Sequence, residues 1–351
     1  MALAALCARR GGVAVLDGGM GTGLGALGLT ESECWSAGTR LGEQRIRDAV
    51  TEVHLLYLRA GADILTANTY NVSAARDERD GRQPAERQHL EANMELAQQA
   101  IAAFARERPD APPPLLAASM GSYATSLSRA ETANRAADDL AGERISGYGL
   151  GQGRLEEFHR SRAATVLAAG AQLLAFETIP DLVEARAIAA VLEQLQAQEG
   201  AGTIEAWVTF TCRDAGAGDG ICDHGDLFED CVRAVAGCAI VVGVGFNCTE
   251  PHLAPMLLRT ARAIVGDDKL LVCYPNSGEM YDTTISGGSE AWRTVDGSPP
   301  PVGGPAEFAA MARHWREQGA DVVGGCCRIG PEEIAAVSEA FPRGQSSGGA
   351  T

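Results

Sequence analysis

The sequence predicts a single (β/α)₈ barrel of the TIM type, and three observations lead to that fold class. Short apolar runs recur along the 351 residues. Each run ends in a polar or glycine-rich loop, and an amphipathic helical segment often follows it. The runs are nearly continuous rather than alternating, which indicates strands buried on both faces of a parallel sheet. Strands that alternate with helices in this way favour one closed barrel.

The predicted strands are spread over the whole chain. They cover residues 13–19, 62–70, 115–121, 171–179, 204–210, 240–248, 270–276 and 321–327. A doubly wound open sheet is the alternative architecture. It would require a glycine-rich phosphate loop with an acidic residue about 20 positions later, and the segment DGGMGTGLG does not fit that pattern cleanly.

Helix start signals lie between these strands. Asp181 precedes an apolar stripe at helical spacing, so we expect a helix to begin there. Asp226, paired with Glu229, and Thr249 are predicted to cap two later helices. Residues 89–107 are predicted to form a long helix before a proline-rich segment. Helices in these places are the crossovers that a parallel barrel needs.

Three of the predicted loops are long, and each follows the C-terminal end of a strand. They cover residues 122–155, 211–226 and 277–304. Because a barrel carries its active site at that end of its strands, we expect these loops to border the site. The domain organisation predicted is one barrel over residues 1–342, followed by a disordered tail over residues 343–351.

Composition and charge exclude several classes of protein. The chain is 46% hydrophobic and 21% charged, which is typical of a globular domain. Its formal net charge of −17 gives no electrostatic footprint for nucleic acid. No apolar run approaches the length of about 18 residues that indicates a membrane span, and residues 1–12 do not resemble a secretory signal. We therefore expect a cytoplasmic protein that works on small molecules as a monomer or weak homo-oligomer.

Three of the ten cysteines stand at predicted strand ends. Cys248 ends the sixth predicted strand, and Cys326 and Cys327 end the eighth. Strand ends of a barrel meet at one face, so these sulfurs would form a soft site that suits zinc and leaves a fourth tetrahedral position for substrate. The two adjacent cysteines can share one metal only if the chain turns there, and Gly324 and Gly325 supply that freedom.

Other interpretations of these cysteines stay open at this point. Free cysteine is often a buried small apolar residue, and Cys326 with Cys327 could form a vicinal disulfide. The other seven cysteines receive no assigned role. Without a signal sequence, the whole set is expected to be reduced, metal-binding or buried rather than a disulfide framework.

Two carboxylates also stand at strand ends. Asp17 closes the first predicted strand and Glu177 the fourth, so both are expected at the mouth of the barrel. One interpretation is a pair that binds a substrate ammonium, because a buried charge needs a partner. The alternatives are turn formation for Asp17 and a salt bridge or helix cap for Glu177. Asn247 and the segment 275–279 lie at strand ends too, where turn formation is again the alternative.

Seven segments in this order resemble the homocysteine S-methyltransferase family. They are LDGGMGTGL, CWSAG, AGADILTANTY, LLAFETIP, GFNC, YPNSGE and GGCCRIGP. The resemblance runs from about residue 13 to residue 337, nearly the whole chain. The segments WSAG and PNSGEMYD make the chain similar to the branch that uses S-methylmethionine or S-adenosylmethionine rather than to the branch that uses betaine.

The resemblance implies a barrel with one zinc ion held by Cys248, Cys326 and Cys327. It also implies that Asp17 and Glu177 hold the amino group of homocysteine. The activity expected from it is zinc-dependent methyl transfer from a sulfonium donor to the thiol of L-homocysteine, which forms methionine.

Two further residues are expected to contact the substrates. Tyr70, and with it Phe246 or Trp292, could offer an aromatic face to the sulfonium cation, and core packing or loop anchoring is the alternative for each. Tyr70 and Asn247 are the two expected to contact substrate. Residues 122–155 and 281–304 depart from the usual form of the family, and both could line the donor site. Selenocysteine as acceptor or betaine as donor stays an alternative. A non-catalytic zinc barrel that senses thiols or metal is the alternative of another class.

Overall fold

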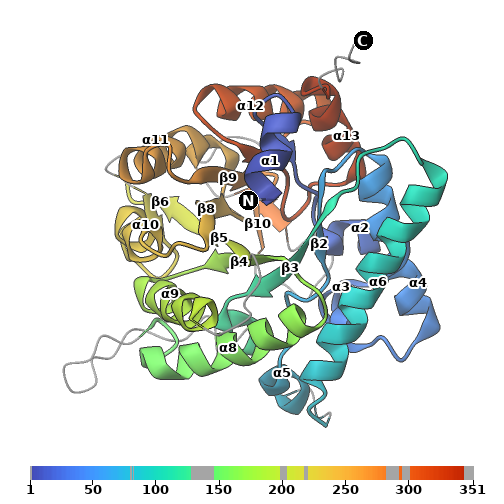
Figure 1. Cartoon of the computed structure of the whole chain (residues 1–351), viewed down its shortest axis with the longest axis horizontal. Helices are drawn as coiled ribbons and strands as arrows, with labels where there is room; N and C mark the ends of the chain where they lie inside the picture. The colour runs from blue at the N-terminus through green and yellow to red at the C-terminus, as the bar shows by residue number, and fades with distance from the viewer. Residues whose placement is uncertain are drawn as a thin grey trace.

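The computed structural model confirms a closed barrel. It describes residues 2–79, 81, 83–127, 146–197, 204–216, 220–281, 292–294 and 301–343. In this part of the chain, parallel strands form a central sheet and helices surround it (Figure 1). The strands are β1 Ala14–Val15, β2 Ile64–Ala67, β3 Leu115–Gly121, β4 Leu173–Ile179, β5 Glu205–Phe210, β8 Val241–Asn247, β9 Leu270–Tyr274 and β12 Val322–Val323. Each of them falls within a predicted strand.

The order of the strands excludes the doubly wound alternative. It is β1-β12-β9-β8-β5-β4-β3-β2, so the first strand pairs with the last one. A parallel bridge between Leu16 and Ile64 links the chain after β1 to β2. The backbone N–H of Asp63 also donates to the carbonyl of Val15 at 2.7 Å. These bonds close the ring, and a closed ring leaves no exposed sheet edge.

Helices form a layer outside the ring, as Figure 1 shows. The longer ones are α4 Gln44–Arg59, α6 Glu86–Glu107, α8 Gln152–Ala168, α9 Leu182–Gln196, α10 Phe228–Ala236, α11 Ala254–Val265, α12 Pro305–Glu317 and α13 Pro331–Ala340. Shorter pieces are α2 Met20–Ala26, α3 Glu31–Ser36, η1 Ala37–Thr39, α5 Ala74–Arg79, η2 Tyr123–Ser126 and η3 Pro251–Leu253. The main apolar core lies between this layer and the sheet.

One predicted helix cap is confirmed and another is wrong. The Asp181 side chain accepts a hydrogen bond from the Glu184 backbone N–H at 2.8 Å, as a cap of α9 should. Asp226, predicted to act with Glu229, does not cap α10. Its carboxylate instead accepts from the backbone N–H of Leu182, at the start of α9, at 2.8 Å. The side chain therefore joins two neighbouring loops at the mouth of the barrel.

The cap predicted at Thr249 is also wrong. The helix α11 begins only at Ala254, after the short turn η3. The Thr249 hydroxyl accepts from the backbone N–H of Cys212 at 3.0 Å. Like Asp226, it uses its side chain to join two loops rather than to start its own helix. The long helix predicted over residues 89–107 is confirmed, although α6 begins three residues earlier.

The helix α1, Ala2–Arg9, closes the end of the barrel opposite to the strand C-termini (Figure 1). Leu3, Leu6 and Cys7 are buried in the apolar cluster that fills the barrel interior, together with Trp207. The backbone N–H of Leu3 donates to the Glu205 carboxylate at 2.9 Å. α1 therefore covers this end of the barrel, and the long loops lie at the other end.

Two of the long loops carry hairpins that were not predicted. The strand β6 Cys212–Asp214 pairs with β7 Gly220–Cys222, and β10 Glu279–Tyr281 pairs with β11 Trp292–Thr294. Of the third loop, residues 128–145 lie outside the described residues. Of the predicted tail, Arg343 pairs with Asp63 at 3.0 Å, and residues 344–351 lie outside the described residues. None of the described helices is long and apolar enough to cross a lipid bilayer.

A buried ion pair beside the ring closure generates the first prediction. Arg10 and Asp63 are only 4% and 3% exposed, and the Arg10 guanidinium donates to the Asp63 carboxylate. Asp63→Asn leaves that guanidinium without its buried counter-charge. We expect the free energy of unfolding to fall by about 3 kcal/mol, measured by urea denaturation.

The control is Glu107→Gln, whose partner is Arg59. The side chains of this pair are 39% and 40% exposed, so the expected loss is below about 1 kcal/mol. If the free energy of unfolding falls equally in both variants, the buried pair does not stabilise the closed ring more than an exposed pair does.

Candidate metal and substrate site

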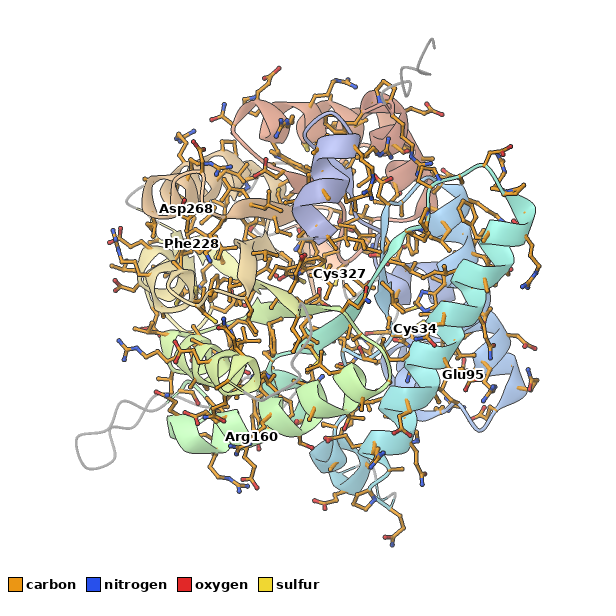
Figure 2. All side chains as sticks on the ribbon, in the orientation of Figure 1. Cys34, Glu95, Arg160, Phe228, Asp268 and Cys327 are labelled. Carbon is orange, nitrogen blue, oxygen red and sulfur yellow. The ribbon has the colours of Figure 1, made fainter. Side chains whose placement is uncertain are left out.

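The three cysteine sulfurs meet at the C-terminal end of the strands. Cys248 follows β8, and Cys326 and Cys327 follow β12. The Cys248 and Cys327 sulfurs are 3.6 Å apart, and those of Cys326 and Cys327 are 4.0 Å apart. All three lie within 4.8 Å of one another, and Figure 2 shows Cys327 close to the barrel axis. The predicted convergence is confirmed, and the sulfurs are too far apart for a vicinal disulfide.

Tight backbone packing makes the turn that this convergence requires. A Cβ atom on Gly324 would lie 2.6 Å from the Cβ of Leu16, and one on Gly325 would lie 2.1 Å from the Cγ2 of Ile329. The backbone N–H of Gly325 donates to the carbonyl of Asp17 at 3.1 Å. The loop after β12 is therefore pressed against the loop after β1. This contact brings the cysteine pair and Asp17 to the same side of the mouth.

Hydrogen bonds among the three sulfurs shift the pKa values of their thiols in opposite directions. Hydrogen bonds from Cys248 and Cys326 hold the pKa of the Cys327 thiol well below its usual range. Hydrogen bonds to Cys326 and Cys327, together with burial, raise the pKa of Cys248. Thiolates are the protein ligands that soft metal ions prefer. In the described part of the chain, this is the group whose ligand atoms lie close enough together to hold one metal ion.

Asp17 and Glu177 lie buried at the same mouth. Asp17 is 4% exposed, and its carboxylate accepts hydrogen bonds from the backbone N–H of Thr66 at 2.7 Å and from the Thr66 hydroxyl at 2.9 Å. Glu177 is 9% exposed, and it accepts from the hydroxyls of Ser119 and, at 2.9 Å, Tyr274. Asp17 is thus not simply a turn former, and Glu177 is not a helix cap.

Burial shifts the pKa of both carboxyl groups upward. It raises the pKa of Asp17 well above its usual range, against the hydrogen bonds from Thr66, and the negative charge of Glu177 adds to the shift. Burial raises the pKa of Glu177 to about 7. Neither carboxyl group forms an ion pair with a basic side chain of the described residues. A positively charged group placed beside these two buried acids would stabilise their ionised form.

Tyr70 lies near Cys248 and Cys326. It is half-buried, its hydroxyl bonds to Thr178, and the negative charges of Cys248 and Glu177 raise its pKa together with burial, which has the largest effect. The Tyr70 carbonyl accepts from the fully buried guanidinium of Arg162 at 3.0 Å. Arg162 thereby holds the backbone of the tyrosine in place.

Asn247 uses its hydrogen-bonding capacity within the protein. Its Oδ1 accepts from the Thr178 backbone N–H at 2.7 Å and from the Thr209 hydroxyl at 2.8 Å. Its Nδ2 donates to the Thr178 hydroxyl at 2.8 Å and points at the Cys326 sulfur, 3.9 Å away. An amide has two donor hydrogens and two acceptor lone pairs, so all are in use. The geometry favours a positioning role over the substrate contact predicted from the sequence.

Several polar side chains of the site were not singled out from the sequence. They are Ser119, Thr66, Thr178, Thr209 and Tyr274. Four of them lie within the largely apolar strands β2, β3, β4 and β5, and Tyr274 ends β9. A polar residue inside a buried strand must find a partner. That pattern is the signal that could have identified them.

The other seven cysteines are not part of this site. Cys222 and Cys231 have their sulfurs 3.6 Å apart, away from the metal ligands, and both are fully buried. All ten cysteines are free thiols in the structure, as expected of a chain without a disulfide framework.

The sequence matches known proteins along almost its full length. The family model for homocysteine S-methyltransferase matches residues 14–341. The chain belongs to this family. It is 34% identical to homocysteine S-methyltransferase 1 of Zea mays over 342 residues, which cover 95% of the chain and 96% of that relative. It is 32% identical to homocysteine S-methyltransferase 3 of Arabidopsis thaliana, over 94% of the chain and 90% of that relative.

Solved structures agree with this membership. The metallated form of the homocysteine methyltransferase MmuM from Escherichia coli is 28% identical, with a TM-score of 0.72, and the match covers 93% of this chain and 96% of that one. The oxidised form of the same protein gives a TM-score of 0.74 over 96% of this chain and 99% of that one. The family resemblance and the barrel predicted from the sequence are both confirmed.

The cysteine cluster generates the second prediction. Cys327→Ala removes the sulfur that lies close to both others, so we expect the variant to lose bound metal while the fold survives. Elemental analysis after metal loading measures this loss, and circular dichroism checks the fold. Cys34→Ala is the control, because Cys34 is a half-buried cysteine of α3 and is not among the clustered sulfurs. A Cys327→Ala protein that keeps one equivalent of metal would remove Cys327 from the site.

Proposed function

We propose that this protein transfers a methyl group from a sulfonium donor to the thiol of L-homocysteine and so forms methionine. The donor is S-methylmethionine or S-adenosylmethionine, and the cofactor is one zinc ion per chain. The observation that carries the proposal is the pairing of two partial sites in one mouth. Three sulfurs lie close enough together to hold one metal ion, and two buried carboxyl groups have no basic partner among the described residues.

The spacing of the sulfurs supports zinc. Tetrahedral zinc with Zn–S bonds of about 2.3 Å places neighbouring sulfurs about 3.8 Å apart. The Cys327 sulfur lies 3.6 Å from that of Cys248 and 4.0 Å from that of Cys326. Cys248, Cys326 and Cys327 would supply three ligands, and three protein ligands leave one position open to a substrate atom. Closed structural zinc sites use four protein ligands, so the set suits catalysis better than stability.

The carboxylates support an amino acid as acceptor. Homocysteine carries an ammonium group and a thiol, which match Asp17 with Glu177 and the cysteine cluster respectively. Ammonium binding would supply the positive charge that the two buried acids lack. The protein would hold the acceptor at both ends, which orients its sulfur for reaction.

The reaction requires little acid–base catalysis by the protein. A free alkyl thiol has a pKa of about 8.5, so little thiolate exists at neutral pH. Bound zinc would supply a deprotonated acceptor thiol. The acceptor sulfur then forms a bond to the methyl carbon while the bond from that carbon to the donor sulfur breaks. The donor leaves as a neutral thioether, so no leaving-group acid is required.

The work of the remaining residues is alignment and exclusion of water. The attacking sulfur, the methyl carbon and the leaving sulfur must lie in line at near-attack distance. Tyr70, held by Thr178 and Arg162, would face the sulfonium cation with its ring. The net charge of −17 adds a mild general attraction for a cationic donor.

An assay of methionine formation tests the proposal. Homocysteine is supplied with S-methylmethionine, S-adenosylmethionine or betaine, each with and without a zinc chelator. We expect product with a sulfonium donor, little with betaine, and at least a tenfold loss of rate with chelator. Restoring zinc should restore the rate.

Other outcomes identify the alternatives. Product with betaine would assign the chain to the other donor class, and selenocysteine in place of homocysteine tests the other acceptor. Zinc-loaded protein that makes no product from any donor would contradict the proposed activity and favour a sensor.

A further inference from the structure

We propose that Tyr274 is a positioning residue whose hydroxyl fixes the Glu177 carboxylate in the orientation that receives the ammonium of the acceptor. This inference rests on the proposed function and deepens it. It assigns a role to the tyrosine of YPNSGE, a segment whose own chemistry the proposed function leaves unexplained.

The phenol ring of Tyr274 is held from the side of β5. Tyr274 ends β9 and is 3% exposed. Its ring meets the ring of Trp207 edge-on, at 6.4 Å between centroids and 70° between planes. The indole Nε1–H of Trp207 donates to the Tyr274 oxygen at 3.2 Å, and the Thr209 hydroxyl lies 2.8 Å from it. Trp207 and Thr209 are two residues apart on one strand, so both side chains point inward.

The Tyr274 hydroxyl then controls one oxygen of Glu177. It donates to Oε2 of Glu177 at 2.9 Å, while the Ser119 hydroxyl donates to Oε1. Each carboxylate oxygen therefore has its own donor, one from β9 and one from β3. Two donors restrict rotation of the carboxylate, which is otherwise broad about its last torsion. Each oxygen can still accept a further hydrogen bond, so the carboxylate remains able to bind an ammonium.

The same hydroxyl also lies beside polar side chains that lead toward the cysteine cluster. Thr209, 2.8 Å from the Tyr274 oxygen, donates to Oδ1 of Asn247 at 2.8 Å. The Nδ2 of Asn247 points at the Cys326 sulfur. A buried row of polar groups thus runs from the carboxylate to a sulfur of the cluster. Tyr274 stands at the junction where this row meets Glu177.

A role in packing alone does not account for the hydroxyl. Phenylalanine would fill the same space, yet the Tyr274 oxygen contacts the Glu177 carboxylate and the Thr209 hydroxyl, besides accepting from the indole of Trp207. Removing the oxygen leaves Glu177 with Ser119 as its hydroxyl donor and frees the carboxylate to turn. Recognition of the acceptor amine should suffer, while contacts with the rest of the acceptor should not.

Binding measurements on zinc-loaded protein test the proposal. Isothermal titration calorimetry gives the Kd of L-homocysteine and of its analogue in which hydrogen replaces the amino group. Wild type should bind homocysteine more tightly than the analogue. Tyr274→Phe should raise the Kd of homocysteine about tenfold and leave the Kd of the analogue unchanged. If Tyr274 had only a structural role, the variant would bind both ligands more weakly by the same factor, and that result would overturn the proposal.

Two further variants and a metal measurement sharpen the test. Thr209→Val removes a hydroxyl from the same row but leaves the bond between Tyr274 and Glu177, so it should keep the preference for the amine. Tyr274→Phe added to Glu177→Gln should cause no further loss, because the two residues act through one carboxylate. Additive losses, or loss of zinc from Tyr274→Phe alone, would overturn the proposal.

The outcome for wild type separates this inference from the proposed function. Wild type that prefers the amine but makes no methionine contradicts the methyl transfer and leaves the role of Tyr274 intact. Wild type that binds both ligands equally contradicts the ammonium site and with it the role of Tyr274.

Discussion

Closure of the sheet between β1 and β2 is the constraint on which the rest of the structure depends. The bridge from Leu16 to Ile64 completes a ring, and a ring forces all strand C-termini to one mouth. Within this ring, the pairing of β1 with β12 places Asp17 beside the loop that carries Cys326 and Cys327. The glycines after β12 let the last loop press against the first one, so the closure also sets the position of the cysteine pair.

In the described part of the chain, the mouth holds two buried acids that have no basic side chain as a partner. Asp17 and Glu177 are buried, and their hydrogen bonds come from neutral groups such as Thr66 and Ser119. Burial of such groups is unfavourable and raises their pKa. A ligand that brings an ammonium group would relieve this cost. Such a site would favour ligands with an ammonium group, independently of any contact between the ligand and the cysteine sulfurs.

The sequence was sufficient for the barrel and for the residues that end its strands. Cys248, Cys326 and Cys327 were predictable as a cluster because the fold class alone brings strand ends together. The inner network of Thr209 and Tyr274 was not, because it depends on which side chains face inward in each strand. The pairings of β4 with β5 and of β5 with β8 contain register shifts that affect which side chains face inward. Such shifts cannot be recognised in the sequence of an apolar run.

Contacts between loops were the other source of error. Asp226 and Thr249 have the residue types of helix caps, yet both bond to a neighbouring loop at the mouth. The helix α1 was missed because its N-terminal partner, Glu205, lies about 200 residues further along the chain. Local sequence patterns identify helices and strands, whereas residues distant in the sequence determine the hydrogen bonds made at their ends.

X-ray absorption spectroscopy of the zinc-loaded protein, without any methyl donor, tests the central claim most directly. It counts the sulfur atoms around the metal before and after L-homocysteine is added. The account predicts three sulfur ligands from Cys248, Cys326 and Cys327, and a fourth once homocysteine binds. A count that stays at three at saturating homocysteine would contradict the claim that this cluster activates the acceptor thiol.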